Sequence, residues 1–114
     1  MKQDKLRHLV ASEVASIGDP HRRAALQAIV VSPTSHQRSS VYVDGSFTCW
    51  VVGYEREGSD VLVYCDEGPF GDPWGCLDAK DGDLGQDAQW FVTLDDAFIF
   101  GMWDGPLPPG YEVQ

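Results

Sequence analysis

The spacing of apolar residues changes from a helical period to strict alternation near residue 39, and this change constrains the fold more than any other feature of the sequence. Over residues 4–17, apolar side chains recur three or four positions apart, which predicts an amphipathic helix that ends at Gly18. The dipeptide Asp19–Pro20 supplies an N-cap and a proline at the first helical position. A second helix is therefore expected to run from this proline to about Val30.

Alternating apolar residues and turn signals predict three strands, which follow a polar connector at residues 32–38. Residues 39–43 and 46–55 flank Asp44–Gly45, a dipeptide typical of a two-residue type I′ hairpin turn. Residues 61–65 come after a second polar turn. These three segments are expected to form an antiparallel meander.

The expected strand pairing places apolar residues on both faces of this meander. Across the second turn, Val52 is expected opposite Cys65, and Tyr54 opposite Val63. Because alternate residues point to opposite faces, Cys49 and Cys65 are then on opposite sides of the sheet, and a disulfide between them is rejected. The helices can cover one face. Either the aromatic C-terminal third covers the other face, or part of that face stays open for a partner.

The C-terminal third contains signals for one further strand and one short helix. Residues 89–92 are interpreted as a strand, and Thr93 is the expected N-cap of a helix that runs to about Phe100 and stops at Gly101. Together these elements predict a single α+β domain over residues 1–114. In it, an N-terminal helical pair packs on an antiparallel β-meander sheet with a short C-terminal helix.

Charge is distributed unevenly along the chain, whose formal net charge is −10. Residues 1–38 carry six lysines or arginines against three carboxylates, whereas residues 39–114 carry two against fifteen. A surface of this kind repels phosphate backbones and acidic membranes, so we expect no binding to nucleic acid or membrane. It attracts a basic protein partner, and simple solubility is the competing explanation.

Residues 65–83, CDEGPFGDPWGCLDAKDGD, contain six carboxylates, a density that raises the question of a metal loop. An EF-hand frame that starts at Asp78 has a lysine at its third position, and a frame that starts at Asp81 has no glutamate at its twelfth. No P-loop lysine accompanies the glycines, and no spacing singles out two carboxylates as a catalytic pair. We therefore expect no essential metal and no cofactor, with a weak calcium site as the remaining alternative.

Apolar residues within this acidic segment, among them Phe70 and Trp74, distinguish it from a disordered linker. They are expected to order the segment against the body of the protein, so that its carboxylates point outward. We interpret the result as a surface for a basic protein, with Trp74 as the anchor and the carboxylates steering the approach. The predicted partner-binding residues are Asp66, Glu67, Asp72, Trp74, Asp78, Asp81, Asp83 and Asp87.

The three cysteines, Cys49, Cys65 and Cys76, have no CxxC spacing, and the histidines all lie within the first third of the chain. Nothing in the sequence pairs a thiol with a base, so each cysteine is interpreted as a small buried hydrophobe. No catalytic residue is predicted, and the protein is expected not to be an enzyme. The N-terminus lacks an apolar stretch for a signal peptide, and no run reaches the length of a membrane span, so we expect a cytoplasmic location.

Two segments that cover about the last two-fifths of the chain resemble the small acidic immunity proteins of bacterial toxin–immunity systems. They read DEGPFGDPWGCLDAKDGDLGQD and WFVTLDDAFIFGMWDGPLPPGYEV. Proteins of that class are single cytoplasmic domains, frequently α+β, that neutralise a cognate toxin by occluding its active site. The resemblance implies a protein partner and no catalysis by this chain. Two alternatives stay open, namely a non-catalytic accessory or structural domain, and an enzyme with an unrecognised carboxylate or cysteine site.

Overall fold

The computed structural model describes residues 2–111, and the chain opens with two helices, as the sequence predicts. Helix α1 spans Gln3–Ala15 and helix α2 spans Pro20–Ile29. The Asp19 side chain accepts a hydrogen bond from the backbone N–H of His21 at 3.0 Å, which confirms the predicted N-cap. None of the helices within the described residues is long and apolar enough to span a membrane.

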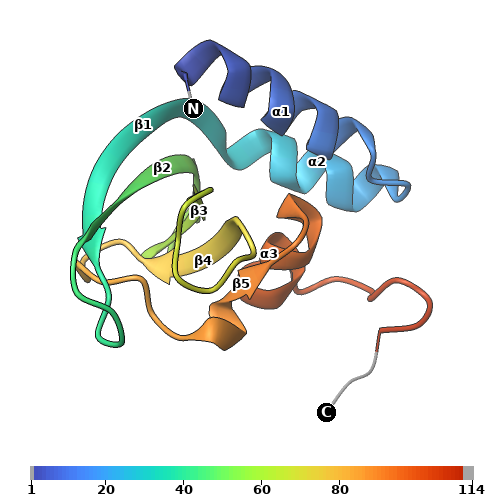
Figure 1. The fold of residues 1–114 in the computed structure, drawn as a ribbon. Helices are drawn as coiled ribbons and strands as arrows, with labels where there is room; N and C mark the ends of the chain where they lie inside the picture. Colours follow the sequence, from blue (N-terminus) through green and yellow to red (C-terminus); the bar gives the residue numbers. More distant parts are fainter. Residues whose placement is uncertain (1, 112–114) are drawn as a thin grey trace.

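Five antiparallel strands form one sheet in the described part of the chain, and their spatial order follows the sequence, β1-β2-β3-β4-β5 (Figure 1). This arrangement confirms the predicted α+β fold with its antiparallel meander. The strands are β1 (Val30–Ser39), β2 (Ser46–Tyr54), β3 (Asp60–Tyr64), β4 (Trp74–Asp78) and β5 (Trp90–Phe91).

Strand β1 corrects the prediction for the segment between the helices and the sheet. It begins directly after α2 and includes residues 32–38, which the sequence analysis interpreted as a polar connector. Ser39 pairs with Ser46, so residues 40–45 form the connecting loop, and the predicted strand with a two-residue turn is wrong. Because β1 is an edge strand, it tolerates polar side chains and Pro33, and apolar alternation gives no signal for it.

A bulge in β2 overturns the predicted register between β2 and β3. Val51 pairs with Val63, and the register shifts before the next pair, which leaves Val52 without a partner in the ladder. The extra residue shifts the alternation of β2 by one position, and the predicted partners of Val63 and Cys65 are both wrong. Cys49 faces the same side of the sheet as Cys65, so the prediction that the two lie on opposite faces is also wrong.

The two faces of the sheet are covered by different parts of the chain. Helix α3 (Leu94–Gly101) joins α1 and α2 on one face, whereas Phe70, Leu84 and Trp90 cover the other. Of the aromatic C-terminal run, Trp90 therefore covers the second face, and Phe98 packs on the helix side. The helix-side core comprises Leu6, Val10, Val14, Ile17, Leu26, Val52, Leu62, Tyr64, Trp74, Cys76, Leu94, Ala97 and Phe98. The loop-side core comprises Cys49, Val51, Val61, Val63, Cys65, Leu77, Leu84 and Trp90.

Polar contacts join α3 to the two N-terminal helices. The Thr93 side chain accepts a first-turn N–H of α3 at 3.1 Å, which confirms the predicted N-cap. Glu13 of α1 accepts the backbone N–H of Leu94 at 2.8 Å. Arg22 of α2 binds both carboxylate oxygens of Asp95, at 2.9 and 3.1 Å. Thr93 and Glu13 thereby satisfy backbone donors at the start of α3 that the helix itself leaves unpaired, whereas Arg22 donates to a carboxylate of α3. The contacts of Glu13 and Arg22 hold the three helices together.

Candidate protein-binding surface

Strand β4 divides the predicted acidic segment into two loops. Residues 66–73 connect β3 to β4, and residues 79–83 follow β4. The strand between them separates its terminal Cα atoms by about 13 Å, because a strand rises about 3.3 Å per residue. The predicted carboxylates therefore divide between the two ends of β4. Asp66, Glu67 and Asp72 precede the strand, whereas Asp78 is its last residue and Asp81, Asp83 and Asp87 follow it.

Trp74, the predicted anchor, is the first residue of β4 and is 2% exposed. Its ring meets Tyr64 edge-on within the helix-side core, with centroids 4.7 Å apart. A side chain in this position is not accessible to a partner, so the prediction that Trp74 anchors a complex is wrong. The error has a physical cause: β4 is buried on both faces, and such a strand shows no polar–apolar alternation in its sequence.

Arg38, which the sequence analysis did not single out, holds the 79–83 loop in place. It lies in β1, its side chain is 6% exposed, and it binds three backbone carbonyl oxygens. Its Nη1 donates to the carbonyls of Asp81 and Asp83 at 2.8 Å each, and its Nη2 donates to that of Asp78 at 3.2 Å. The loop is thereby fixed against the edge of β1.

Two carboxylates at the C-terminal end of β4 accept hydrogen bonds from nearby backbone N–H groups. Asp78 Oδ1 accepts the N–H of Lys80 at 2.8 Å, and Asp83 Oδ1 accepts the N–H of Gly85 at 2.9 Å. Asp81 is exposed and points its charge to solvent. The hydrogen bonds of the 79–83 loop therefore mainly hold its own conformation. Toward a partner, the loop contributes negative charge that acts at long range.

The 66–73 loop contains an aromatic contact that the sequence did not predict. Phe70 is half-buried and packs against the loop-side core. Its ring meets the ring of Tyr42 edge-on, with centroids 5.9 Å apart. Tyr42 belongs to the 40–45 loop and is 61% exposed. The contact joins two loops that lie far apart in the sequence, and one of its rings stays accessible.

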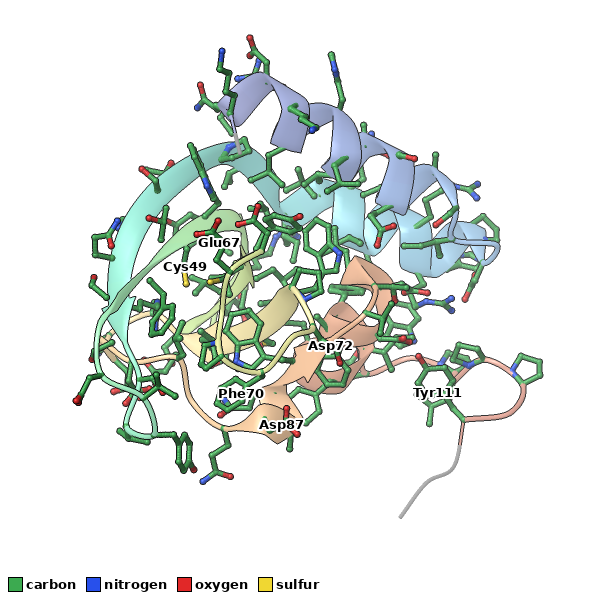
Figure 2. The ribbon with its side chains drawn as sticks, in the orientation of Figure 1. Cys49, Glu67, Phe70, Asp72, Asp87 and Tyr111 are labelled. Atoms are coloured by element: carbon green, nitrogen blue, oxygen red, sulfur yellow. The ribbon has the colours of Figure 1, made fainter. Side chains whose placement is uncertain are left out.

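Both of the loops that make this contact carry carboxylates. Asp66, Glu67 and Asp72 belong to the same loop as Phe70, and Asp44 follows Tyr42 by two positions. Figure 2 shows Phe70, Asp72 and Asp87 in the lower half of the view, with Asp87 in the short 3₁₀ helix η1 (Asp87–Gln89). We call the set formed by the two joined loops the acidic–aromatic surface. Its members are Tyr42, Asp44, Asp66, Glu67, Phe70 and Asp72.

Burial and neighbouring charge shift the pKa values of two ionisable groups near the acidic segment, Asp60 and Cys76. Burial, followed by the charges of Glu55 and Asp78, raises the pKa of Asp60, which pairs with Asp78 across β3 and β4. Burial and then nearby carboxylates raise the pKa of the Cys76 thiol to about 12, so this thiol stays protonated at neutral pH. In the described part of the chain, no group of three or more His, Cys, Asp or Glu side chains could hold a metal ion.

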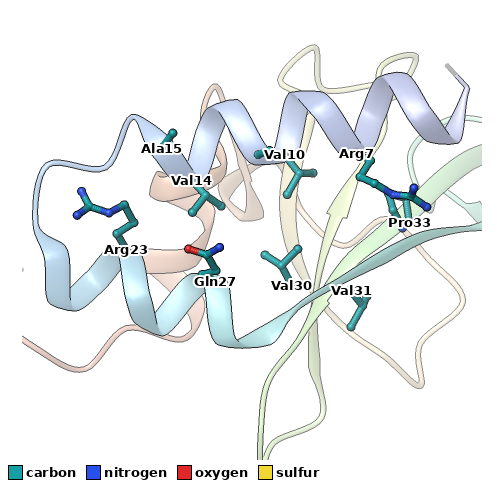
Figure 3. Close-up of a pocket in the computed structure, with 10 residues that line it drawn as sticks. Arg7, Val10, Val14, Ala15, Arg23, Gln27, Val30, Val31 and Pro33 are labelled. Atoms are coloured by element: carbon teal, nitrogen blue, oxygen red, sulfur yellow. The ribbon is translucent and has the colours of Figure 1, made fainter.

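A groove of about 500 Å³ lies between α1, α2 and the start of β1 (Figure 3). Valine and alanine side chains form its walls, and Arg7 and Arg23 lie at its two ends. Arg23 is already engaged, because its Nη1 donates to the carbonyl of Ile17 at 2.7 Å. Among the described residues, the lining includes no carboxylate, imidazole or thiol, so it offers apolar contact and positive charge without an acid–base pair.

Comparisons with protein-family models, with curated proteins and with solved structures found no match for this chain. The resemblance to immunity proteins therefore stays a prediction.

Proposed function

We propose that the protein is a non-catalytic, cytoplasmic binding protein that occludes a basic protein partner through its acidic–aromatic surface, in the manner of an immunity protein that inhibits a toxin. The observation that carries the proposal is the contact between Tyr42 and Phe70, which joins two loops that together carry four carboxylates. An exposed tyrosine supported by a second ring is a rigid, amphipathic anchor. Such side chains contribute most of the binding energy in many interfaces.

The charge of the chain supports a basic partner. Residues 39–114 carry fifteen carboxylates against two basic residues, and four of these carboxylates belong to the acidic–aromatic surface. Charge of one sign raises the association rate of an oppositely charged protein, and carboxylates at the rim of an interface affect this rate more than the lifetime of the complex. We therefore assign the anchoring role to Tyr42 and the steering role to the carboxylates.

The test of the anchor uses Tyr42→Ala and the product of a reading frame adjacent to this gene as the candidate partner. We expect affinity to fall by about 2 kcal/mol, which is about 30-fold in Kd, chiefly through faster dissociation. Because Tyr42 is exposed, the melting temperature should stay close to that of the wild type. Val92→Ala is the matched control, since Val92 is also an exposed apolar residue and lies outside both loops. Equal dissociation rates for the two variants would exclude the surface.

The test of steering uses two charge variants of equal net charge. Asp66→Asn with Glu67→Gln should slow association at low salt and flatten its salt dependence. Asp81→Asn with Asp104→Asn removes the same charge from exposed positions outside the acidic–aromatic surface. If both pairs slow association equally, the carboxylates act through total charge and not through this surface. A partner that is acidic, or association insensitive to salt, would favour the alternative of an accessory or structural domain.

A further inference from the structure

Cys49 and Cys65 lie together in the loop-side core. Trp50 pairs with Tyr64 in the ladder between β2 and β3, so the next position along the ladder places Cys49 directly opposite Cys65. Both side chains are 1% exposed, and both thiols are free. The bulge at Val52 brings them to one face of the sheet, and without it they would point to opposite faces.

The position of this pair meets the backbone requirement for a disulfide. Directly opposite residues in antiparallel strands have Cα atoms about 4.5–5.5 Å apart, and disulfides usually join residues whose Cα atoms are about 4.4–6.8 Å apart. Both side chains belong to the same buried cluster, and hydrogen bonding between their thiols is the largest influence on the pKa of each. The remaining cysteine, Cys76, lies in the helix-side core, on the other face of the sheet.

We propose that Cys49 and Cys65 form a dithiol site that reduces a small neutral peroxide and becomes an intramolecular disulfide. The site does not rest on the proposed function, since in the free protein it requires only the register of β2 and β3 and access through the loop above it.

Cys65 is the thiol that reacts first. A hydrogen bond from the Cys49 thiol lowers the pKa of Cys65 against the opposing effect of burial, and the backbone N–H of Glu67 adds to the lowering. The same thiol–thiol hydrogen bond, followed by burial and the negative charge of Cys65, raises the pKa of Cys49. Cys65 also lies directly beneath the 66–73 loop, so we assign the first step to Cys65 and the second to Cys49.

The reaction has two steps. The Cys65 thiolate attacks one oxygen of hydrogen peroxide, the O–O bond breaks, and the hydroxide that leaves takes up a proton to become water, which produces Cys65 sulfenic acid. The Cys49 sulfur then attacks the Cys65 sulfur, the S–S bond forms, and the sulfenic hydroxyl leaves as water with the Cys49 proton. The dithiol loses two protons and two electrons, and one peroxide takes them up and becomes two waters.

The 66–73 loop controls access to Cys65. A Cβ atom placed on Gly68 would lie 3.3 Å from Cys65 Sγ, so the sulfur lies directly beneath the backbone of this loop. Opening of the loop exposes the thiol without separation of the strands. The loop carries Asp66, Glu67 and Asp72, whose charges repel anionic oxidants such as glutathione disulfide but not neutral hydrogen peroxide.

The experiment treats the reduced, folded protein with hydrogen peroxide, labels the remaining thiols with N-ethylmaleimide in denaturant, and maps tryptic peptides by mass spectrometry. Trypsin cleaves after Arg38, Arg56 and Lys80, so residues 39–56 contain Cys49 and residues 57–80 contain both other cysteines. We expect these two peptides to be joined by a disulfide that dithiothreitol reverses. Fragmentation within the second peptide should place its single maleimide on Cys76.

Two variants test the roles of the cysteines. Cys76→Ser should retain the disulfide, and Cys49→Ala should abolish it and leave a Cys65 sulfenic acid that dimedone traps. Circular dichroism checks that each variant is folded, and the wild type and Cys76→Ser decide the result if Cys49→Ala does not fold. Half-buried Met102 shows whether the peroxide has reacted with the protein. The proposal is overturned if all three cysteines still carry maleimide once Met102 is oxidised. It is also overturned if the disulfide includes Cys76, or if the disulfide forms only in urea.

Discussion

Replacement of Arg38 by methionine tests whether a single buried cation holds the 79–83 loop. Methionine keeps much of the apolar volume of the arginine stem and removes the donors. In the folded protein, the guanidinium is 6% exposed and donates three hydrogen bonds to backbone carbonyls at 2.8, 2.8 and 3.2 Å. The substitution leaves these carbonyls without their partner.

The expected loss of stability follows from the count of these bonds. A hydrogen bond from a charged donor contributes about 1.5–3 kcal/mol, but carbonyls near the surface recover part of this free energy from water. We therefore take about 1 kcal/mol for each bond and expect a loss of about 3 kcal/mol. For a domain of this size, that corresponds to a fall in Tm on the order of 10 °C.

The assay is urea unfolding followed by tryptophan fluorescence, together with hydrogen exchange of the Leu84 amide. That amide donates to the Ser39 carbonyl at 2.9 Å and reports directly on the attachment of the loop to β1. Arg38→Lys should retain the charge and part of the stability, because one ammonium cannot reproduce the forked guanidinium. Arg56→Met is the matched control, since Arg56 is exposed in the β2–β3 turn.

Two results would refute this account of Arg38. One is a loss below about 1 kcal/mol, which is the range of ordinary surface substitutions such as Arg56→Met. The other is unchanged protection of the Leu84 amide in Arg38→Met, which would mean that the loop is held by its backbone contacts alone.

Two further predictions concern buried groups near the acidic segment. Trp74→Ala should cost about 3–5 kcal/mol of stability in urea unfolding, because the ring lies in the helix-side core, and a stable variant with weakened partner binding would contradict this placement. Burial, followed by neighbouring carboxylates that include Asp78, raises the pKa of Asp60. The folded state therefore binds this proton more tightly than the unfolded chain, and stability falls as the pH rises through the raised pKa. Asp60→Asn should add about 0.2–1 kcal/mol at pH 7 and nothing below the ordinary carboxyl pKa, and an equal gain at both pH values would exclude the electrostatic cause.

Helix positions were predictable because their signals are local. The N-caps Asp19 and Thr93 each act on backbone groups within three positions, and both were predicted from the sequence and are observed. The α+β class followed in the same way from the change of apolar period near residue 39. Strand β1 was missed because an edge strand with polar side chains resembles a connector in sequence.

The strand register was not predictable, since it depends on side chains from separate strands. One extra residue at Val52 reversed the relation between Cys49 and Cys65, which changed a rejected disulfide into a neighbouring pair of thiols. Gly53, which follows the bulged residue, is a local signal for the bulge, since an isolated glycine within a strand often marks one.

The candidate surface was partly predictable from the sequence, and the tertiary structure decided the rest. The sequence by itself determined that the chain after residue 38 is strongly acidic and that apolar residues order its acidic segment, because charge and composition do not depend on the fold. The tertiary structure decided which aromatic residue is accessible. It buried Trp74 in β4, and it brought Tyr42 of one loop against Phe70 of another. Contacts between distant loops form only after the strands have paired, so no local pattern in the sequence encodes them.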